Sequence, residues 1–336
     1  MFGRAGFLVV VLLAMSFASP LATPPAPAAA QAFGGRILAP AGRQAAWLDL
    51  EAPRPRPLTQ LDAPAYVTDV SAVSVASTAV LGVSSPFGGQ GSTGTDLFAL
   101  DLAAWVLSPL VQRTNASESL GAPAWWADGS RLLFQNEDHG VVGIGYPGVS
   151  TVIYPTRIES VQPDGSGRKL LVNDARQPAP APDGTGFAFL RTSTEGTALI
   201  MRNYPEPSEK ILILAGVFRD ITSPRYSPQG DRIAFMAPGS FVGQASPNLL
   251  TGILGTGIAL AHGFPWDLWV VSADGSGVRR LAQLGGDDAT VAWSPDGGQL
   301  FVYGGTGSFL VDASTGEVTP IPYVAGYGGV AWLAES

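Results

Sequence analysis

The chain has 336 residues, of which 46% are hydrophobic, and its 42 Gly and 28 Pro show no collagen-like period. This combination excludes a disordered chain and favours an all-β domain of many short strands joined by tight turns. The absence of Cys excludes disulfides, thiol catalysis and Cys-ligated metals, and a formal charge of -8 argues against a nucleic-acid partner.

Residues 1–32 have the pattern of an export signal followed by a Pro/Ala-rich segment. Arg4 supplies the positive charge, and the apolar run from Phe7 to Phe17 is too short to cross a bilayer comfortably. Ala30-Gln31-Ala32 fits a small-x-small cleavage site, and Ser16-Phe17-Ala18 is a second candidate. The sequence therefore predicts an exported protein, periplasmic, cell-surface or extracellular in a bacterium. The alternative is an uncleaved segment that anchors the chain.

From residue 33 onward the chain contains an internal repeat. Segments 122–134, 223–235 and 290–302 align with one another, 178–189 shares their turn and second strand, and 71–81 keeps only their apolar pattern. In the aligned units one strand ends in a turn where Pro fixes φ and Gly accepts positive φ, and a β-branched and aromatic strand follows. Four such strands in a unit of about 40 residues is typical of a propeller blade.

Counting the units predicts six blades and a closed ring. The approximate blade extents are 33–62, 63–117, 118–175, 176–215, 216–286 and 287–328. The first unit lacks an inner strand, whereas Val330-Ala331-Trp332-Leu333 repeats the inner-strand start Val291-Ala292-Trp293 with no blade after it. We therefore expect residues 33–336 to form a single six-bladed β-propeller in which the C-terminal strand completes blade one.

Three motifs carry a resemblance to a known family. They are the Trp-Ser-Pro-Asp-Gly turn at 293–297, the Asp-Leu-Trp-Val-Val strand at 267–271 and the Asp-Gly-Ser-Gly-Val-Arg-Arg-Leu stretch at 274–281. They resemble the WD-like β-propeller repeats of the TolB type, and the likeness is strongest in blades three to six. The resemblance implies a secreted or periplasmic propeller that works chiefly through protein–protein contacts. We expect no counterpart of the N-terminal α/β domain that precedes the propeller in TolB.

Long loops between second and third strands are expected on one face, at 84–95, 136–150 and 238–265, and loops gathered on one face are commonly binding loops. The blade-five loop has no Asp, Glu, Lys or Arg over 240–263. The candidate binding residues in it are Leu249, Leu250, Ile253, Leu254, Ile258 and Leu260. Two interpretations stay open: the loop buries its own side chains over the channel, or it docks a partner protein or a membrane.

The same face is expected to carry acidic residues. They are Glu137 and Asp138 in the blade-three loop and Asp174, Asp220, Asp287 and Asp288 between blades. These residues are ordinary surface charge or, alternatively, an acidic ring at the channel mouth that attracts a calcium ion or a basic peptide. His139 would join such a metal site, whereas His262 is expected to be structural.

No catalytic motif stands out in the sequence. It contains no G-x-S-x-G elbow, no H-E-x-x-H and no phosphate-binding loop, and no spacing singles out a triad around its two His. We therefore predict a monomeric, non-catalytic interaction module without a cofactor, whose partner is an envelope or extracellular protein. The alternative is a propeller hydrolase or lyase that holds a divalent metal at the acidic channel mouth and acts on a sugar or lactone.

Overall fold

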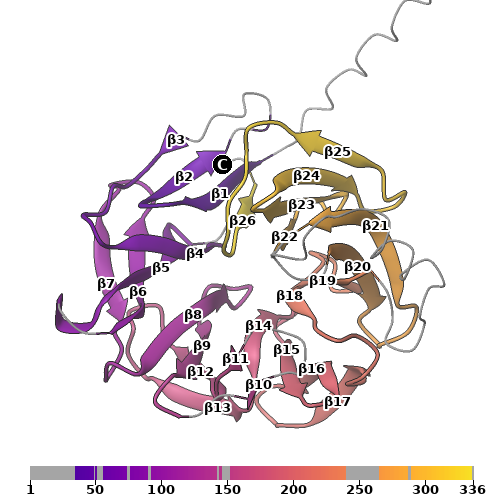
Figure 1. The fold of residues 1–336 in the computed structure, drawn as a ribbon, viewed down its shortest axis with the longest axis horizontal. Helices are drawn as coiled ribbons and strands as arrows, with labels where there is room; N and C mark the ends of the chain where they lie inside the picture. The colour runs from indigo at the N-terminus through magenta and orange to yellow at the C-terminus, as the bar shows by residue number, and fades with distance from the viewer. Residues whose placement is uncertain are drawn as a thin grey trace, which may run out of the picture. The chain divides into compact units, whose positions relative to one another are not determined.

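Six four-stranded antiparallel sheets stand in a ring in the computed structural model (Figure 1). The structure describes residues 35–48, 50, 56–73, 76–89, 92–141, 144–145, 152–239, 265–286 and 289–334. The predicted signal segment, the 240–263 loop with its six candidate binding residues, Asp287 and Asp288 lie outside these residues. The prediction of an all-β, six-bladed propeller is confirmed.

The strands of each blade are given from the inner strand outward, which is also the chain order except in blade 1, where the inner strand is the last strand of the chain. Blade 1 comprises β26 (Ala331–Leu333), β1 (Arg36–Ala41), β2 (Gln44–Leu48) and β3 (Arg56–Pro57). Blade 2 comprises β4 (Tyr66–Ser71), β5 (Thr78–Pro86), β6 (Thr93–Asp101) and β7 (Leu107–Val111). Blade 3 comprises β8 (Glu118–Trp125), β9 (Leu132–Asp138), β12 (Thr156–Val161) and β13 (Lys169–Asn173).

The other three blades repeat this order. Blade 4 comprises β14 (Arg176–Pro180), β15 (Gly186–Ser193), β16 (Gly196–Asn203) and β17 (Glu209–Ile213). Blade 5 comprises β18 (Thr222–Tyr226), β19 (Arg232–Pro238), β20 (Trp266–Ser272) and β21 (Arg279–Gly286). Blade 6 comprises β22 (Thr290–Trp293), β23 (Gln299–Gly304), β24 (Gly307–Asp312) and β25 (Val318–Ile321).

The ring closes as predicted, through the strand at the C-terminal end of the chain. β26 is the inner strand of blade 1 and pairs antiparallel with β1, with Ile37 opposite Trp332 and Leu38 opposite Ala331. This pairing gives blade 1 its fourth strand and joins the two ends of the described chain in one sheet.

Two of the three predicted long loops are partly strand. In blade 2 the pairing of β5 with β6 continues through Ser84 and Thr95 to Pro86 and Thr93, so the predicted loop 84–95 shrinks to the short connection that contains η1 (Phe87–Gly89). In blade 3, β9 runs to Asp138, and a small hairpin of β10 (Ile144–Gly145) and β11 (Val152–Ile153) follows. Both segments were predicted as enlarged connections between second and third strands, and in both the flanking strands continue to pair beyond the predicted loop boundary.

Aromatic side chains of the repeat fill the space between neighbouring blades. Phe134, Phe189, Phe235 and Phe301 of the second strands are fully buried. The inner-strand tryptophans belong to the same interblade clusters; Trp332, for example, packs with Ile37 of blade 1 and Phe301 of blade 6. The repeated aromatic positions are therefore core positions, and the faces of the blades are held together by burial of apolar surface.

A layer of hydrogen bonds joins the inner strands around the whole ring. β4, β8, β14 and β18 each contain a register shift at this level, and an N–H or hydroxyl at every blade junction donates to the next blade. In ring order the bonds run from Gly329 N to Asp69 Oδ1 (2.9 Å), from Ala122 N to Asp69, from Gln177 N to Gln135 Oε1 (3.1 Å), from Ser223 N to Gln177 Oε1 (2.6 Å), from Val291 N to Ser223 Oγ (3.1 Å) and from Thr290 Oγ1 to Gly328 O (2.8 Å).

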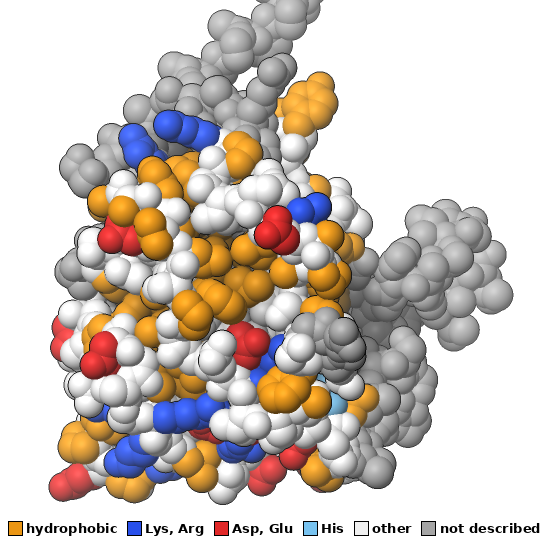
Figure 2. All heavy atoms as spheres, turned by 90° about the vertical axis from the view of Figure 1, so that its left-hand side faces the viewer, with side chains coloured by type: hydrophobic (Ala, Val, Ile, Leu, Met, Phe, Trp, Pro, Cys, Tyr) orange, Lys and Arg blue, Asp and Glu red, His pale blue; other side chains and the backbone are white. Residues whose placement is uncertain are grey.

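Apolar side chains also reach the outer surface of the ring. Figure 2 shows the side on which β3 and β7 lie, where hydrophobic side chains form a band with charged side chains along its edges. Next to β7, Trp105 and Val106 are 42% and 59% exposed. Single exposed apolar residues are ordinary on protein surfaces and do not by themselves mark a binding site.

Candidate functional site

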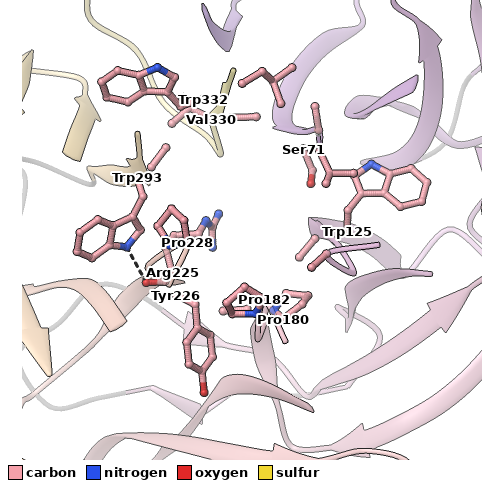
Figure 3. A pocket seen from close by; sticks show the side chains of 18 of the residues that line it. Ser71, Trp125, Pro180, Pro182, Arg225, Tyr226, Pro228, Trp293, Val330 and Trp332 are labelled. Atoms are coloured by element: carbon pink, nitrogen blue, oxygen red, sulfur yellow. Dashed lines mark hydrogen bonds between the residues drawn. The ribbon is translucent and has the colours of Figure 1, made fainter. Parts of the chain in front are cut away.

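A cavity of about 360 Å³ lies at the centre of the ring and is lined by all six blades. Its walls are the last residues of the inner strands and the first residues of the turns that follow them. Figure 3 shows the opening, with Pro180, Pro182 and Pro228 around it. The cavity therefore opens on the face of the first-to-second-strand turns, opposite the face on which we expected binding loops.

The turns around the mouth contact one another in sequence. Trp126 Nε1 lies 3.4 Å from where a Cβ on Gly184 would stand, and Gln229 Nε2 donates to Asp296 O in the next turn at 2.9 Å. The Pro-Asp-Gly chemistry of these turns forms them locally: at Gly297, φ is +75°, a backbone conformation that glycine adopts without steric cost. Local turn chemistry thus builds the rim of the cavity.

One level of the wall is formed by five small residues and one arginine. Each belongs to a different inner strand, stands at the equivalent register position and lines the cavity: Ser71, Ala124, Ala179, Arg225, Ala292 and Ala331. The next residue along four of these strands is aromatic, and its ring points away from the opening (Figure 3), as Trp125, Tyr226, Trp293 and Trp332 show. The small residues leave the room that the arginine side chain occupies.

Arg225 of blade 5 lines one side of the opening, next to Pro228 (Figure 3). Its Nη1 donates to Pro224 O at 2.8 Å, and its backbone carbonyl accepts from Trp293 Nε1 at 3.0 Å. Its Nη2 lies 3.8 Å from where a Cβ on Gly329 of blade 1 would stand. Burial lowers the pKa of Arg225, and the charge of Asp69 opposes this shift only in part.

Asp69 of blade 2 is the carboxylate that acts on Arg225. It accepts hydrogen bonds from the N–H groups of Gly329 and Ala122, yet burial raises its pKa above the ordinary value. Among the residues that the structure describes, Arg225 has no carboxylate oxygen within 4 Å. The centre of the ring thus holds one cation and one carboxylate that influence each other without a direct ion pair.

On the opposite face, two acidic side chains are paired with arginine. Asp220 accepts from Arg176 Nη2 at 2.6 Å and from Thr197 Oγ1 at 2.7 Å. Glu118, whose side chain is 6% exposed, accepts from Arg157 Nη2 at 2.8 Å. The first pair joins blade 4 to the segment that leads into blade 5, and the second lies within blade 3.

The other acidic candidates with described positions, Glu137, Asp138 and Asp174, each have different surroundings. Asp138 accepts from Ser117 Oγ (2.8 Å) and from Gly140 N (2.9 Å), and these hydrogen bonds lower its pKa. Glu137 bonds His139 Nε2 at 2.6 Å, and Asp174 is exposed at the end of blade 3 with φ +51°.

The described residues contain no group of three or more His, Asp or Glu that could hold a metal ion. Within the described residues, the structure therefore does not assemble a metal site from the acidic candidates Glu137, Asp138, Asp174 and Asp220. None of the described segments forms a helix with the length and hydrophobicity that crossing a bilayer requires.

Sequence reasoning missed Arg225 and Asp69. The signal for Arg225 was present in the repeat alignment, because this position holds Ala in the units at 122–134 and 290–302. A large charged residue in a column of alanines marks a place where one blade differs from the others. Asp69 lies in the degenerate second unit, where no aligned motif drew attention to it.

Comparison with known proteins establishes the fold. No protein-family model and no curated protein matches the sequence. The structure is similar to TolB from Acinetobacter baumannii (16% identity, 89% of this chain, 67% of that chain, TM-score 0.61). It is also similar to a chain of a nidogen/laminin complex (10% identity, 89% of this chain, 98% of that chain, TM-score 0.60). A third similar structure is a puromycin-hydrolyzing peptidase of Mycobacterium tuberculosis (15% identity, 86% of this chain, 45% of that chain, TM-score 0.54). The predicted likeness to TolB-type propellers is confirmed at the level of the fold.

Proposed function

We propose that this chain is an exported, non-catalytic β-propeller that binds a protein partner at or outside the cell envelope. The observation that carries the proposal is the central cavity, whose wall is mostly Ala, Pro, Val and aromatic residues and offers shape and apolar surface. One neighbour in fold comes from a nidogen/laminin complex, which illustrates that a propeller can serve a protein complex.

The chemistry of the wall favours binding over catalysis. Of the serines that line the cavity, Ser227 and Ser294 donate their hydroxyls to Asp231 and Asp296 within their own turns. No histidine is among the described residues that line it, so these hydroxyls lack the adjacent base that activates a serine nucleophile. The metal-dependent hydrolase or lyase alternative needs ligands that the described acidic residues do not assemble.

A single introduced thiol tests where a partner binds, because the chain contains no Cys. Ala127→Cys, at the cavity rim, is labelled with a photo-crosslinker and irradiated in native envelope and medium fractions. Glu195→Cys, on an exposed turn of the opposite face, is the matched control. A protein crosslinked from position 127 and not from 195 is the expected result. Crosslinking from 195 alone, or from neither position, would contradict binding at the cavity face.

Export has its own test. We expect the mature chain to occur in the envelope or medium fraction and to begin after Ala32 or after Ala18, as read by intact mass. An uncleaved chain in the envelope would favour the anchored alternative, and a chain confined to the cytosol would overturn the proposal of export.

A further inference from the structure

We propose that the central cavity binds the free C-terminal carboxylate of an extended peptide, and that Arg225 is the residue that receives it. This inference rests on the proposed protein-binding function and names the part of the partner that the cavity takes. It is carried by the cavity, by the position of Arg225 in it and by the incomplete pairing of its charge.

The position of Arg225 is the first argument. Five inner strands place Ser or Ala at this level, and the sixth places an arginine whose side chain reaches from blade 5 to Gly329 of blade 1. The guanidinium thus lies at the wall of the cavity that the small residues leave open. A ligand that enters from the first-to-second-turn face meets the guanidinium at the level of the inner strands.

The charge of Arg225 is the second argument. A guanidinium can donate five hydrogen bonds, and one side-chain bond is present, from Nη1 to Pro224 O. Asp69 is held by the backbone of Gly329 and Ala122 and forms no ion pair with Arg225. A partly buried cation that makes no direct ion pair is stabilised by an added anion, and a carboxylate matches the guanidinium with two parallel hydrogen bonds.

The wall favours a peptide as the carrier of the carboxylate. It combines proline rings, such as Pro178 and Pro180, with the hydroxyl of Ser71 and the guanidinium of Arg225. Peptide amides can pair with such polar groups, whereas an alkyl chain leaves them unmatched. A volume of about 360 Å³ lies near the lower end for ligand pockets. It suits a single chain end better than a loop, which needs two strands side by side.

Binding of tetrapeptides tests the proposal directly. A fluorescent tetrapeptide library with free C-terminal carboxylates is compared with the same library as C-terminal amides. Both are titrated against the wild-type chain, Arg225→Gln, and Arg279→Gln as a matched loss of charge on the exposed strand β21. We expect the peptides that bind the wild type to lose about 10- to 100-fold in affinity on amidation and on Arg225→Gln. Arg279→Gln should change the affinity by less than about twofold.

A second variant keeps the test independent of the charge change. Ala124→Leu places a larger side chain in the wall at the level of Arg225 and should weaken the same peptides at least tenfold. Melting curves of every variant establish folding; if Arg225→Gln fails to fold, Ala124→Leu and the acid–amide comparison on the wild type decide the outcome.

Three results would overturn the inference: amides that bind as tightly as acids, Arg225→Gln or Ala124→Leu binding like wild type, or binding of octanoate without any peptide. If a partner still crosslinks from position 127 after such a result, the inference fails while the proposed function stands. Loss of both the carboxylate preference and the crosslinking from position 127 would overturn the proposed function as well.

Discussion

The backbone N–H of Gly329 donates to Oδ1 of Asp69 at 2.9 Å, so a residue just before the last strand is bound to the second blade. The same carboxylate accepts the N–H of Ala122 in blade 3. Asp69 therefore joins three consecutive blades at the level of the channel. This layer supports the ring closure that β26 provides, and its members are the first places to test the fold.

Gly328→Ala should destabilise the propeller strongly. At Gly328, φ is +101°, and a Cβ there would stand 1.8 Å from the backbone oxygen of Thr68. Strain and overlap together should lower the free energy of unfolding by about 3 kcal/mol or more, measured by urea denaturation. Gly42→Ala is the matched control: its φ is +66° but nothing lies within 4 Å, so a loss of about 1–2 kcal/mol is expected. Equal losses at both positions would contradict the close approach of blade 1 to β4.

Asp69→Asn should change how stability depends on pH. Burial raises the pKa of Asp69 in the folded chain above its ordinary value of 3.8. A carboxyl whose pKa is higher in the folded than in the unfolded chain stabilises the fold when it is protonated. This contribution is complete below the unfolded pKa and is lost as the pH rises through the folded pKa. The unfolding free energy of Asp69→Asn relative to wild type should therefore rise as the pH increases from about 3 to 7. Parallel pH profiles for the two chains would speak against a desolvated carboxyl at this position.

Glu118→Gln should show the opposite dependence. Burial opposes ionisation, but hydrogen bonds from Thr114, Asn136 and Arg157 outweigh it and lower the pKa of Glu118 to about 2. The ionised group therefore stabilises the fold above its ordinary pKa of 4.5, and this contribution disappears as the pH falls towards about 2. Glu118→Gln should cost about 1–3 kcal/mol at pH 7, and the difference from wild type should shrink in acid.

The control for this experiment is Glu195→Gln, which changes an exposed residue in a turn of blade 4. Its unfolding free energy should stay within about 0.5 kcal/mol of wild type. A Glu118→Gln difference that persists unchanged at pH 2 would show that the lost stability comes from packing and not from the ionised carboxylate.

Trp332→Ala tests the closure of the ring. Trp332 is 8% exposed and packs in the cluster between blades 6 and 1. Removing its indole should cost about 3–5 kcal/mol in the free energy of unfolding, as for other buried aromatic side chains. Trp105→Ala removes an indole that is 42% exposed in a turn of blade 2 and should stay within about 0.5 kcal/mol. Comparable losses in thermal and urea unfolding would mean that the closing strand bears little of the stability.

The blades could be predicted because their signals are local. Combinations of Pro, Asp and Gly mark the first turns of blades 3 to 6, and the strand after each turn alternates or runs apolar. Each of these units can therefore be recognised from its own sequence. The surplus strand at 330–333 and the missing one before residue 36 are complementary, and β26 pairs with β1 as expected. Loop lengths were less predictable. Ser84 and Thr95 face each other across a hairpin because their strands continue to pair, a contact that polar composition does not reveal.

The candidate site divides in the same way. By itself the sequence determined the blade count, the closing strand and the turns that rim the cavity, because turn chemistry and strand periodicity act between near neighbours in the chain. Only the tertiary structure decided that Arg225 and Asp69 act on each other, and that five small residues and one arginine stand at one level. These relations join residues of different blades, and they exist only once the ring has closed.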